Sequence, residues 1–239
     1  MKEKTKKVVT SKERDSSIEL FRIITMLVII AHHYLFHSGL FEQIIINNNI
    51  SVNSIFLLLF GWGGKVGINC FLMITGYFMC KSNITIKKFL KLLFEVELYN
   101  IVIYFIFVIS GYTHISFNGV INAILPFTSL NTNFIGCYLI FFLFIPFINI
   151  LINNMEKKSH FLLICLCLFI FSFLPILNIN ISFSYISWFI VVYLIASYIR
   201  IYPKEWFNDR KKCGILSLMS LLSCFLSVLI GIWLSKYFG

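Results

Sequence analysis

The chain has 239 residues, of which 59% are hydrophobic and 13% are charged, and its formal net charge is +10. Soluble globular domains are nearer half apolar and a quarter charged, so this composition excludes an ordinary soluble domain and indicates an integral membrane protein. The positive charge does not indicate a nucleic-acid partner, because the basic residues cluster between apolar segments, where they act as topology signals.

Seven apolar segments are each near the 20 residues that a helix needs to cross the hydrocarbon core of a bilayer. These spans are predicted at 17–37, 54–80, 89–110, 134–153, 160–177, 184–202 and 214–235. The predicted fold class is therefore all-α, a polytopic integral membrane helix bundle of about seven transmembrane helices, with the lipid bilayer as its partner. Residues 1–16 are predicted to form a basic cytoplasmic segment and residues 17–239 the transmembrane domain.

The basic residues fall in alternate loops between the predicted spans. Seven Lys and Arg residues lie before or at the start of the first span, four between the second and third or at their edges, two between the fourth and fifth, and five between the sixth and seventh or at their edges. Cytoplasmic loops carry such an excess, so the N-terminus is predicted to be cytoplasmic.

Two irregular segments interrupt the apolar pattern. The glycine-rich stretch GWGGKVG (Gly61–Gly67) predicts a kink or a close backbone approach within the second span. The stretch from Gly111 to Asn133 is too short and too interrupted to span, and it is predicted to hold a re-entrant or interfacial helix.

The first span carries an arginine at one end and histidines at the other, in RIITMLVIIAHHYLFH (Arg22–His37). Arg22 and His33 are eleven residues apart, which places them about 20° apart around a helix and about 16 Å apart along it. Both should therefore lie on one wall, with Met26 and Ile29 between them, and we expect this wall to face a protein-lined cavity. Glu19, one turn before Arg22, is placed to pair with it.

Other interpretations of these residues remain open. Arg22 could snorkel to the cytoplasmic headgroups, and the histidines could be wetted anchors at the far interface. His33 and His37 have chelate spacing, but His114 and His160 are isolated and the seven cysteines form no C-x-x-C pair, so no metal is expected. The functional interpretation makes His33 a general base and gives Arg22 an orienting or anion-binding role.

The sequence RDSSIELFRIITMLVIIAHHY resembles the opening of the membrane acyltransferase 3 family, whose signature is an arginine, ten residues and a histidine in the first span. KVGINCFLMITGYFM (65–79) resembles a second family stretch, and KKFLK (87–91) resembles a basic motif usually written with arginines. YLIFFLFIPFIN (138–149) and SWFIVVYLIASYIRIYP (187–203) resemble later spans. The resemblance covers almost the whole chain in order.

This resemblance implies an integral membrane acyltransferase in a bacterial-type cell membrane. Such enzymes transfer an acyl group, often acetyl, from a donor such as acetyl-CoA to a hydroxyl of a surface polysaccharide, a lipid-linked sugar or another cell-envelope acceptor. The resemblance implies catalytic roles for His33 and Arg22. It also implies that Lys87, Lys88 and Lys91 bind the phosphates of the CoA donor, although lysines at this place could serve topology alone.

Three features depart from the family pattern. Members usually have about ten spans, so we expect the chain to be incomplete at its C-terminus. The basic motif has lysines, which lack the bidentate fork of arginine. Asn69 stands where many members have an aspartate. The alternative is therefore a catalytically inactive membrane fragment with a transporter-like or regulatory role, and the oligomeric state stays open.

Overall fold

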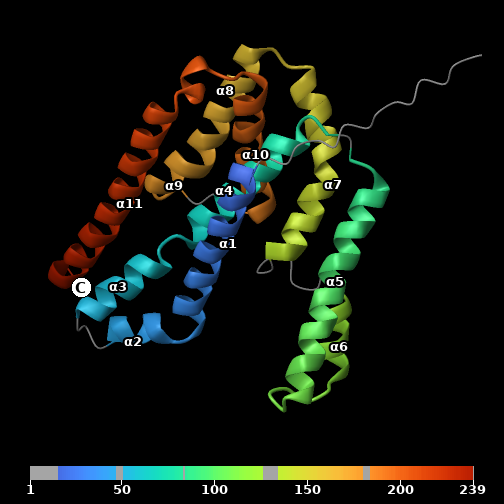
Figure 1. The fold of residues 1–239 in the computed structure, drawn as a ribbon, viewed down its shortest axis with the longest axis vertical. Coiled ribbons are helices and arrows are strands. Elements are labelled where there is room, and N and C mark those ends of the chain that lie inside the picture. The colour runs from blue at the N-terminus through green and yellow to red at the C-terminus, as the bar shows by residue number, and fades with distance from the viewer. Residues whose placement is uncertain (1–15, 47–50, 83, 126–133, 180–183, 239) are drawn as a thin grey trace, which may run out of the picture. The chain divides into compact units, whose positions relative to one another are not determined.

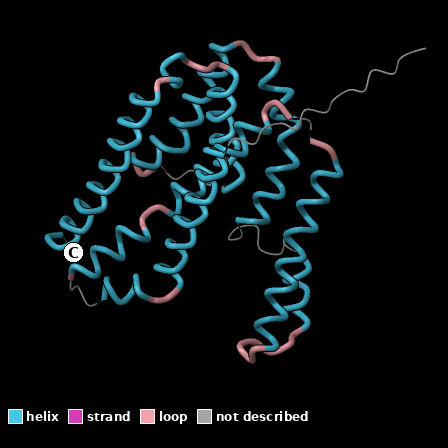
Figure 2. The backbone as a smooth tube through the Cα atoms, viewed as in Figure 1, coloured by secondary structure: helices cyan, strands magenta, loops and turns pink. Residues whose placement is uncertain are grey.

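The computed structural model describes residues 16–46, 51–82, 84–125, 134–179 and 184–238, and no strand occurs among them (Figure 2). The helices are α1 Ser16–His37, α2 Leu40–Ile46, α3 Val52–Gly61, α4 Gly64–Met79, α5 Ile86–Ile109, α6 Phe117–Ile124, α7 Phe134–Asn153, α8 Lys157–Leu168, η1 Phe169–Phe173, α9 Leu174–Ile176, α10 Tyr185–Ile201, η2 Glu205–Asn208 and α11 Arg210–Phe238 (Figure 1). The all-α prediction is confirmed. The predicted basic N-terminal segment lies outside the described residues, apart from its last position.

Six helical segments of the described chain are long and apolar enough to cross a membrane. They are Ser16–His37, Val52–Met79, Ile86–Ile109, Phe134–Asn153, Lys157–Ile176 and Arg210–Leu234. The remaining predicted span corresponds to α10, an apolar helix of 17 residues. Each predicted span thus coincides with an apolar helical segment, which is the expected result where the bilayer requires every backbone group to be paired within a helix.

The chain folds as two compact units, and the first consists of Met1–Phe71 together with Ser223–Gly239. In this unit α1 packs against α3, and the short helix α2 connects them at one end (Figure 1). Ser51 caps α3 by accepting a hydrogen bond of 3.1 Å from the Ser54 backbone N–H. α3 ends at Gly61 and α4 begins at Gly64, so the predicted break in the second span is confirmed.

The glycines at this break allow α1 to approach closely. A β-carbon on Gly61 would overlap the side chain of Leu35, which is almost completely buried. A β-carbon on Gly63 would overlap Val28 in the same way. Glycine is needed here because any larger residue would push α1 away from the α3–α4 junction.

The second unit is Leu72–Leu222, and its core lies between α7 and α10. Phe141 on α7 is fully buried and packs edge-to-face against Phe189 and Tyr193 of α10, with ring centroids 5.8 and 5.7 Å away. α8 also packs against α10. There the Nε2 of buried His160 lies 3.1 Å from the Leu194 carbonyl oxygen.

The helix α6 folds back along α5 in the second unit (Figure 1). The Tyr104 hydroxyl on α5 accepts a hydrogen bond of 3.3 Å from the Ser116 backbone N–H, at the N-cap of α6. The prediction of a short helix after Gly111 is confirmed. Its re-entrant or interfacial position stays a prediction, and residues 126–133 of this stretch lie outside the described residues.

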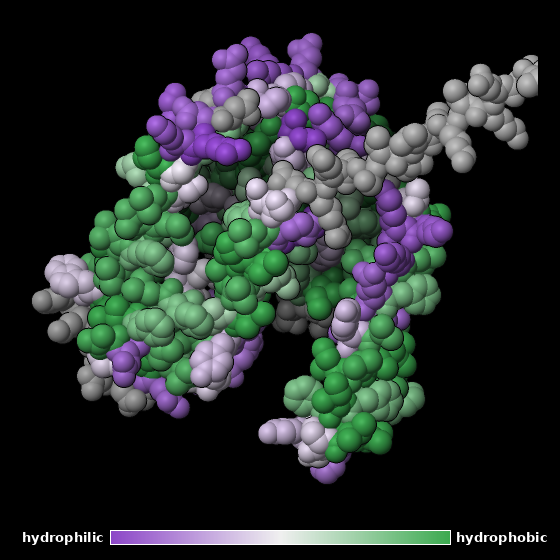
Figure 3. Space-filling view, viewed as in Figure 1, coloured by the Kyte–Doolittle hydropathy of each residue, from purple (hydrophilic) through white to green (hydrophobic). Residues whose placement is uncertain are grey.

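Apolar side chains cover much of the outside of the second unit, as a lipid environment requires. α5 has no buried residue, and Phe105, Ile106 and Phe107 are all exposed along it. Figure 3 shows hydrophobic side chains over the later turns of α5 and over α6, and hydrophilic ones near the α7–α8 connection and the start of α11. That hydrophilic end carries the lysines at 157, 158, 204, 211 and 212.

Candidate functional site

α1 is one continuous helix, so the angular relation expected between Arg22 and His33 holds along it. The Arg22 guanidinium pairs with the Glu19 carboxylate at 3.2 Å, which confirms the pairing predicted from their spacing. The two side chains are 40% and 45% exposed, so the pair contributes little to stability. It places the guanidinium beside the Glu19 carboxylate near the start of α1.

His33 is exposed, and its ring stacks on that of His37 at a centroid separation of 5.2 Å. Met26, on the same wall of the helix, is also exposed. The wall with Arg22 and His33 is therefore not the face of α1 that packs against α3. The expectation that Arg22 and His33 share one cavity stays a prediction.

The neighbouring His32 lies on the packed face of α1. Its Nδ1 is 2.7 Å from the backbone carbonyl oxygen of Gly61. A carbonyl oxygen can only accept, so Nδ1 is the donor in this hydrogen bond, and in the neutral ring Nε2 is left as an acceptor. A β-carbon on Gly64 would overlap the imidazole, so that glycine makes room for the ring.

A pocket of about 340 Å³ opens beside His32 in the first unit. It is lined by His32, Leu35, Phe36, Leu58, Gly61, Trp62, Lys65, Val228 and Ile232. The lining is mostly apolar, and His32 and Lys65 supply its titratable groups. Arg22 and His33 are not among the lining residues.

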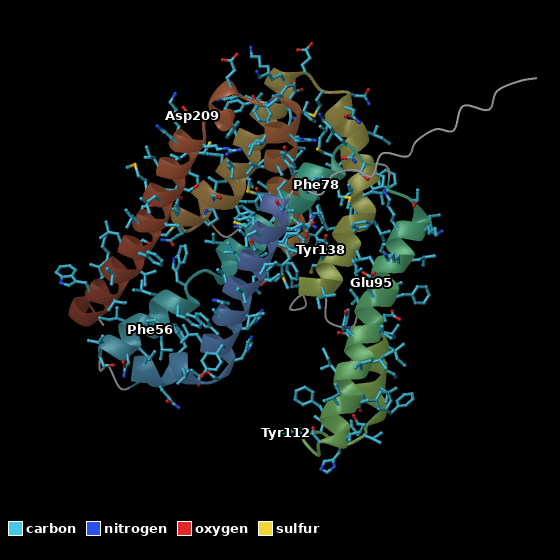
Figure 4. The ribbon with its side chains drawn as sticks, viewed as in Figure 1. Phe56, Phe78, Glu95, Tyr112, Tyr138 and Asp209 are labelled. Carbon is cyan, nitrogen blue, oxygen red and sulfur yellow. The ribbon has the colours of Figure 1, made fainter. Side chains whose placement is uncertain are left out.

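In the second unit, three consecutive residues of α4 contact α7 and α10. Thr75 Oγ1 lies 3.3 Å from the hydroxyl of Tyr138. Figure 4 labels Tyr138, which belongs to α7. Gly76 lies so close to α10 that a β-carbon on it would come within 2.8 Å of a side-chain atom there. The Tyr77 hydroxyl accepts a hydrogen bond of 2.6 Å from Arg200 of α10, whose guanidinium also lies 4.4 Å from the Tyr77 ring centroid. These contacts favour a helix-packing role for the three residues.

A polar chain, formed by Met79, Asn149 and Tyr193, links α4, α7 and α10 near the end of α4. Asn149 of α7 donates a hydrogen bond of 2.9 Å to the Met79 carbonyl oxygen, and the Tyr193 hydroxyl donates one of 2.6 Å to Asn149 Oδ1. Arg200 and Lys81 both lie within electrostatic range of the Cys80 thiol. The C-terminal end of α4 is thus flanked by two cations, and its Met79 carbonyl accepts from the Asn149 amide and, at 3.1 Å, from the Ser82 backbone N–H.

The three lysines of the predicted donor site lie in the first turns of α5, and all are exposed. Lys91 pairs with Glu95, one turn further along α5, at 3.7 Å, and the Lys88 ammonium donates a hydrogen bond of 3.1 Å to the Ser82 hydroxyl. With Lys87 they form an exposed basic patch in the second unit. Arg22 and His33 belong to the first unit.

With this geometry established, comparison with known families decides the identity. A family model described as an acyltransferase domain matches residues 15–239 of the chain. The chain belongs to the membrane acyltransferase 3 family. No curated protein and no solved structure matches it.

The membrane acyltransferase keeps the arginine and histidine of the family signature on one uninterrupted helix. Reasoning from its sequence missed two residues. His32 is one of the ten residues between the arginine and the histidine of the signature, which gives it no role, although the glycines at 61, 63 and 64 indicate a close neighbour. Arg200 is one of the basic residues interpreted as topology signals, although it lies in the last turn of an apolar helix and binds the Tyr77 hydroxyl at a half-buried position of the second unit.

Proposed function

We propose that this membrane acyltransferase transfers an acyl group, acetyl by default, from acyl-CoA to a hydroxyl of a surface polysaccharide, a lipid-linked sugar or another cell-envelope acceptor. The observation that carries the proposal is the family match over residues 15–239, within which Arg22 and His33 fill the signature on α1. Exposure of the His33 ring supports the proposal, because a general base must reach its substrate.

In the proposed reaction His33 accepts the proton of the acceptor hydroxyl while the oxygen attacks the thioester carbonyl. The new C–O bond forms, the C–S bond breaks, and the sulfur leaves as CoA thiolate, which takes the proton back from the imidazolium. His33 could also accept the acyl group first and pass it to the acceptor in a second step. In both routes neutral imidazole is the starting form.

Arg22 is proposed to orient the donor or to stabilise negative charge that develops at the thioester. The position of Arg22 supports this, because its planar guanidinium lies on the wall of α1 that also carries His33. The separation of about 16 Å between the two residues along α1 is comparable to a pantetheine arm of roughly 15–20 Å. The arm is proposed to follow the stretch between them.

The phosphates of the donor are proposed to bind at the basic end of the second unit. Lys87, Lys88 and Lys91 provide exposed point charges there. Arg200 adds a half-buried guanidinium, and among the described residues no carboxylate lies within salt-bridge distance of it. A planar guanidinium can bind a diphosphate with two parallel hydrogen bonds, which a lysine cannot do.

The experiment that tests the proposal uses the purified protein in vesicles, with acetyl-CoA labelled in the acetyl group and an extract of the host cell envelope. We expect the label to move to hydroxyl groups, as hydroxylamine-sensitive esters, with one free CoA released for each ester formed. Empty vesicles control for spontaneous transfer. Absence of both ester and free CoA above that control contradicts the proposal.

A further inference from the structure

The pocket beside His32 has the size and the lining of a ligand site. Its volume of about 340 Å³ falls at the lower end of the range of about 300–1,000 Å³ for small-molecule pockets. Apolar side chains of α1, α3 and α11 form most of its wall, and a small number of polar groups interrupt them. Pockets of this kind bind a largely apolar molecule and orient it through a few polar contacts.

The imidazole of His32 is held in place by its surroundings. The Gly61 carbonyl takes the Nδ1 hydrogen, the absence of a side chain at Gly64 leaves space for the ring, and Phe36 packs on it with ring centroids 4.3 Å apart. These three contacts fix both the tautomer and the plane of the ring. The one polar atom that the ring can still offer to a ligand in the pocket is Nε2, as a hydrogen-bond acceptor.

Lys65 adds a positive charge to the same pocket. It is exposed, so its ammonium is available to a ligand, and it lies one residue after the glycine that seats His32. An anionic group in the ligand would therefore be favoured near Lys65, and a hydroxyl group near His32. The rest of the lining favours a hydrocarbon chain.

The pocket also adjoins the histidine of the family signature. The His32 and His33 rings are 6.1 Å apart between centroids, in an edge-on arrangement. A hydroxylated headgroup that binds at His32 would thus have other hydroxyls within reach of His33.

We propose that this pocket binds the acyl acceptor and that the acceptor is an amphiphile, with a hydrocarbon chain, a phosphate beside Lys65 and a hydroxylated headgroup that donates a hydrogen bond to His32 Nε2. This inference rests on the proposed function, because it assigns the acceptor of the same reaction. Among the acceptors named for that reaction it selects the lipid-linked class, with a phosphate and a hydroxylated headgroup. His32 binds and orients this acceptor, and His33 takes the proton.

Binding is tested with two photoreactive probes in phosphatidylcholine vesicles that contain the purified protein. Both are dodecyl phosphate diesters with a diazirine at the end of the chain. One carries an inositol ring and the other a methyl group, so that their charges match. We expect saturable labelling of Leu58, Val228 or Ile232 by both probes, with about tenfold tighter binding of the inositol probe. The Leu58→Trp variant, which fills the pocket, should abolish this labelling.

Two substitutions test the contacts of His32 and of Lys65 with the probes separately. His32→Asn keeps a side-chain N–H for the Gly61 carbonyl but lacks an acceptor at the position of Nε2. It should remove the preference for the inositol probe while leaving binding of the methyl probe within about twofold of wild type. Lys65→Gln should weaken binding of both probes by about tenfold, because it removes the contact to the phosphate.

Two results would overturn the inference. One is labelling that does not saturate and that spreads equally over exposed residues such as Phe105 and Ile106 of α5. The other is an unchanged inositol preference in His32→Asn. The probes report binding without acyl transfer, so an inactive wild-type protein that shows the expected labelling contradicts the proposed function alone. An active protein without specific labelling contradicts this inference alone.

Discussion

The Arg200 guanidinium donates a hydrogen bond of 2.6 Å to the Tyr77 hydroxyl, and the two residues are 123 positions apart in the sequence. The same guanidinium also lies against the Tyr77 ring. One contact thus combines a charge-assisted hydrogen bond with a cation–π interaction and joins α4 to α10.

Tyr77→Phe removes the hydroxyl and keeps the ring. A hydrogen bond to a charged group contributes about 1.5–3 kcal/mol, so we expect the free energy of unfolding to fall by about that amount. The measurement is equilibrium unfolding in mixed detergent micelles. The matched control is Tyr99→Phe, at an exposed position of α5, which should change the free energy by less than about 0.5 kcal/mol. Equal values for the two variants would contradict the importance of this contact.

Asn149→Leu tests the polar chain that joins α4, α7 and α10. The substitution leaves the Tyr193 hydroxyl without its acceptor and removes one of the two hydrogen bonds to the Met79 carbonyl, which keeps the one from the Ser82 backbone N–H at 3.1 Å. An unsatisfied hydroxyl costs about 1–3 kcal/mol and a lost hydrogen bond about 0.5–1.5 kcal/mol, so a loss of about 1.5–4 kcal/mol is expected in the same unfolding measurement.

The control is Asn154→Leu, since Asn154 is exposed just after the end of α7 and its side chain bonds the Ile150 carbonyl of that same helix. Its stability should stay near that of wild type. Equal free energies of unfolding for the Asn149 and Asn154 variants would show that the polar chain does not stabilise the second unit.

Gly64→Ala tests the close approach of the α3–α4 junction to α1. The added methyl group would overlap the His32 imidazole, and overpacking of this kind costs about 1–3 kcal/mol. Gly231→Ala is the matched control, because a β-carbon there meets no atom within 4 Å. That control should be neutral, or more stable by about 0.5–1 kcal/mol through its higher helix propensity. A Gly64 variant as stable as the control would contradict the packing described at His32.

The predicted membrane orientation is tested with reporter fusions. Alkaline phosphatase is active only after export, and green fluorescent protein fluoresces when it folds in the cytoplasm. The positive-inside rule predicts fluorescence after Ser82, in the first basic loop, and phosphatase activity after Thr113, between α5 and α6. The opposite pattern would place the three α5 lysines outside, where cytoplasmic acyl-CoA cannot reach them.

Much of the fold follows from the sequence alone, because the bilayer imposes simple rules on it. Span positions come from the length of apolar runs, and local pairs such as Glu19–Arg22 and Lys91–Glu95 come from helical spacing. The break at Gly61 is also predictable from the sequence, because glycines in an apolar span indicate a local departure from the regular helix.

The contacts between helices could not be predicted in this way. A helical repeat gives the angle between Arg22 and His33, but it does not say which face of α1 packs against α3. The sequence therefore pointed to His33, and the structure adds His32, which the packed face brings to the Gly61 carbonyl. The Tyr77–Arg200 contact was missed because nothing local relates residues so far apart in the chain.

The central claim is that Arg22 and His33 perform the acyl transfer, and the most direct measurement compares labelled acetyl transfer from acetyl-CoA in membranes with equal amounts of each variant. We predict a loss of about 10²–10⁴-fold for His33→Ala, which removes the proton acceptor, and of at least about tenfold for Arg22→Ala. The controls His114→Ala and Arg210→Ala, both at exposed positions of the second unit, should retain wild-type transfer. Equal incorporation by wild type, His33→Ala and Arg22→Ala would contradict the claim.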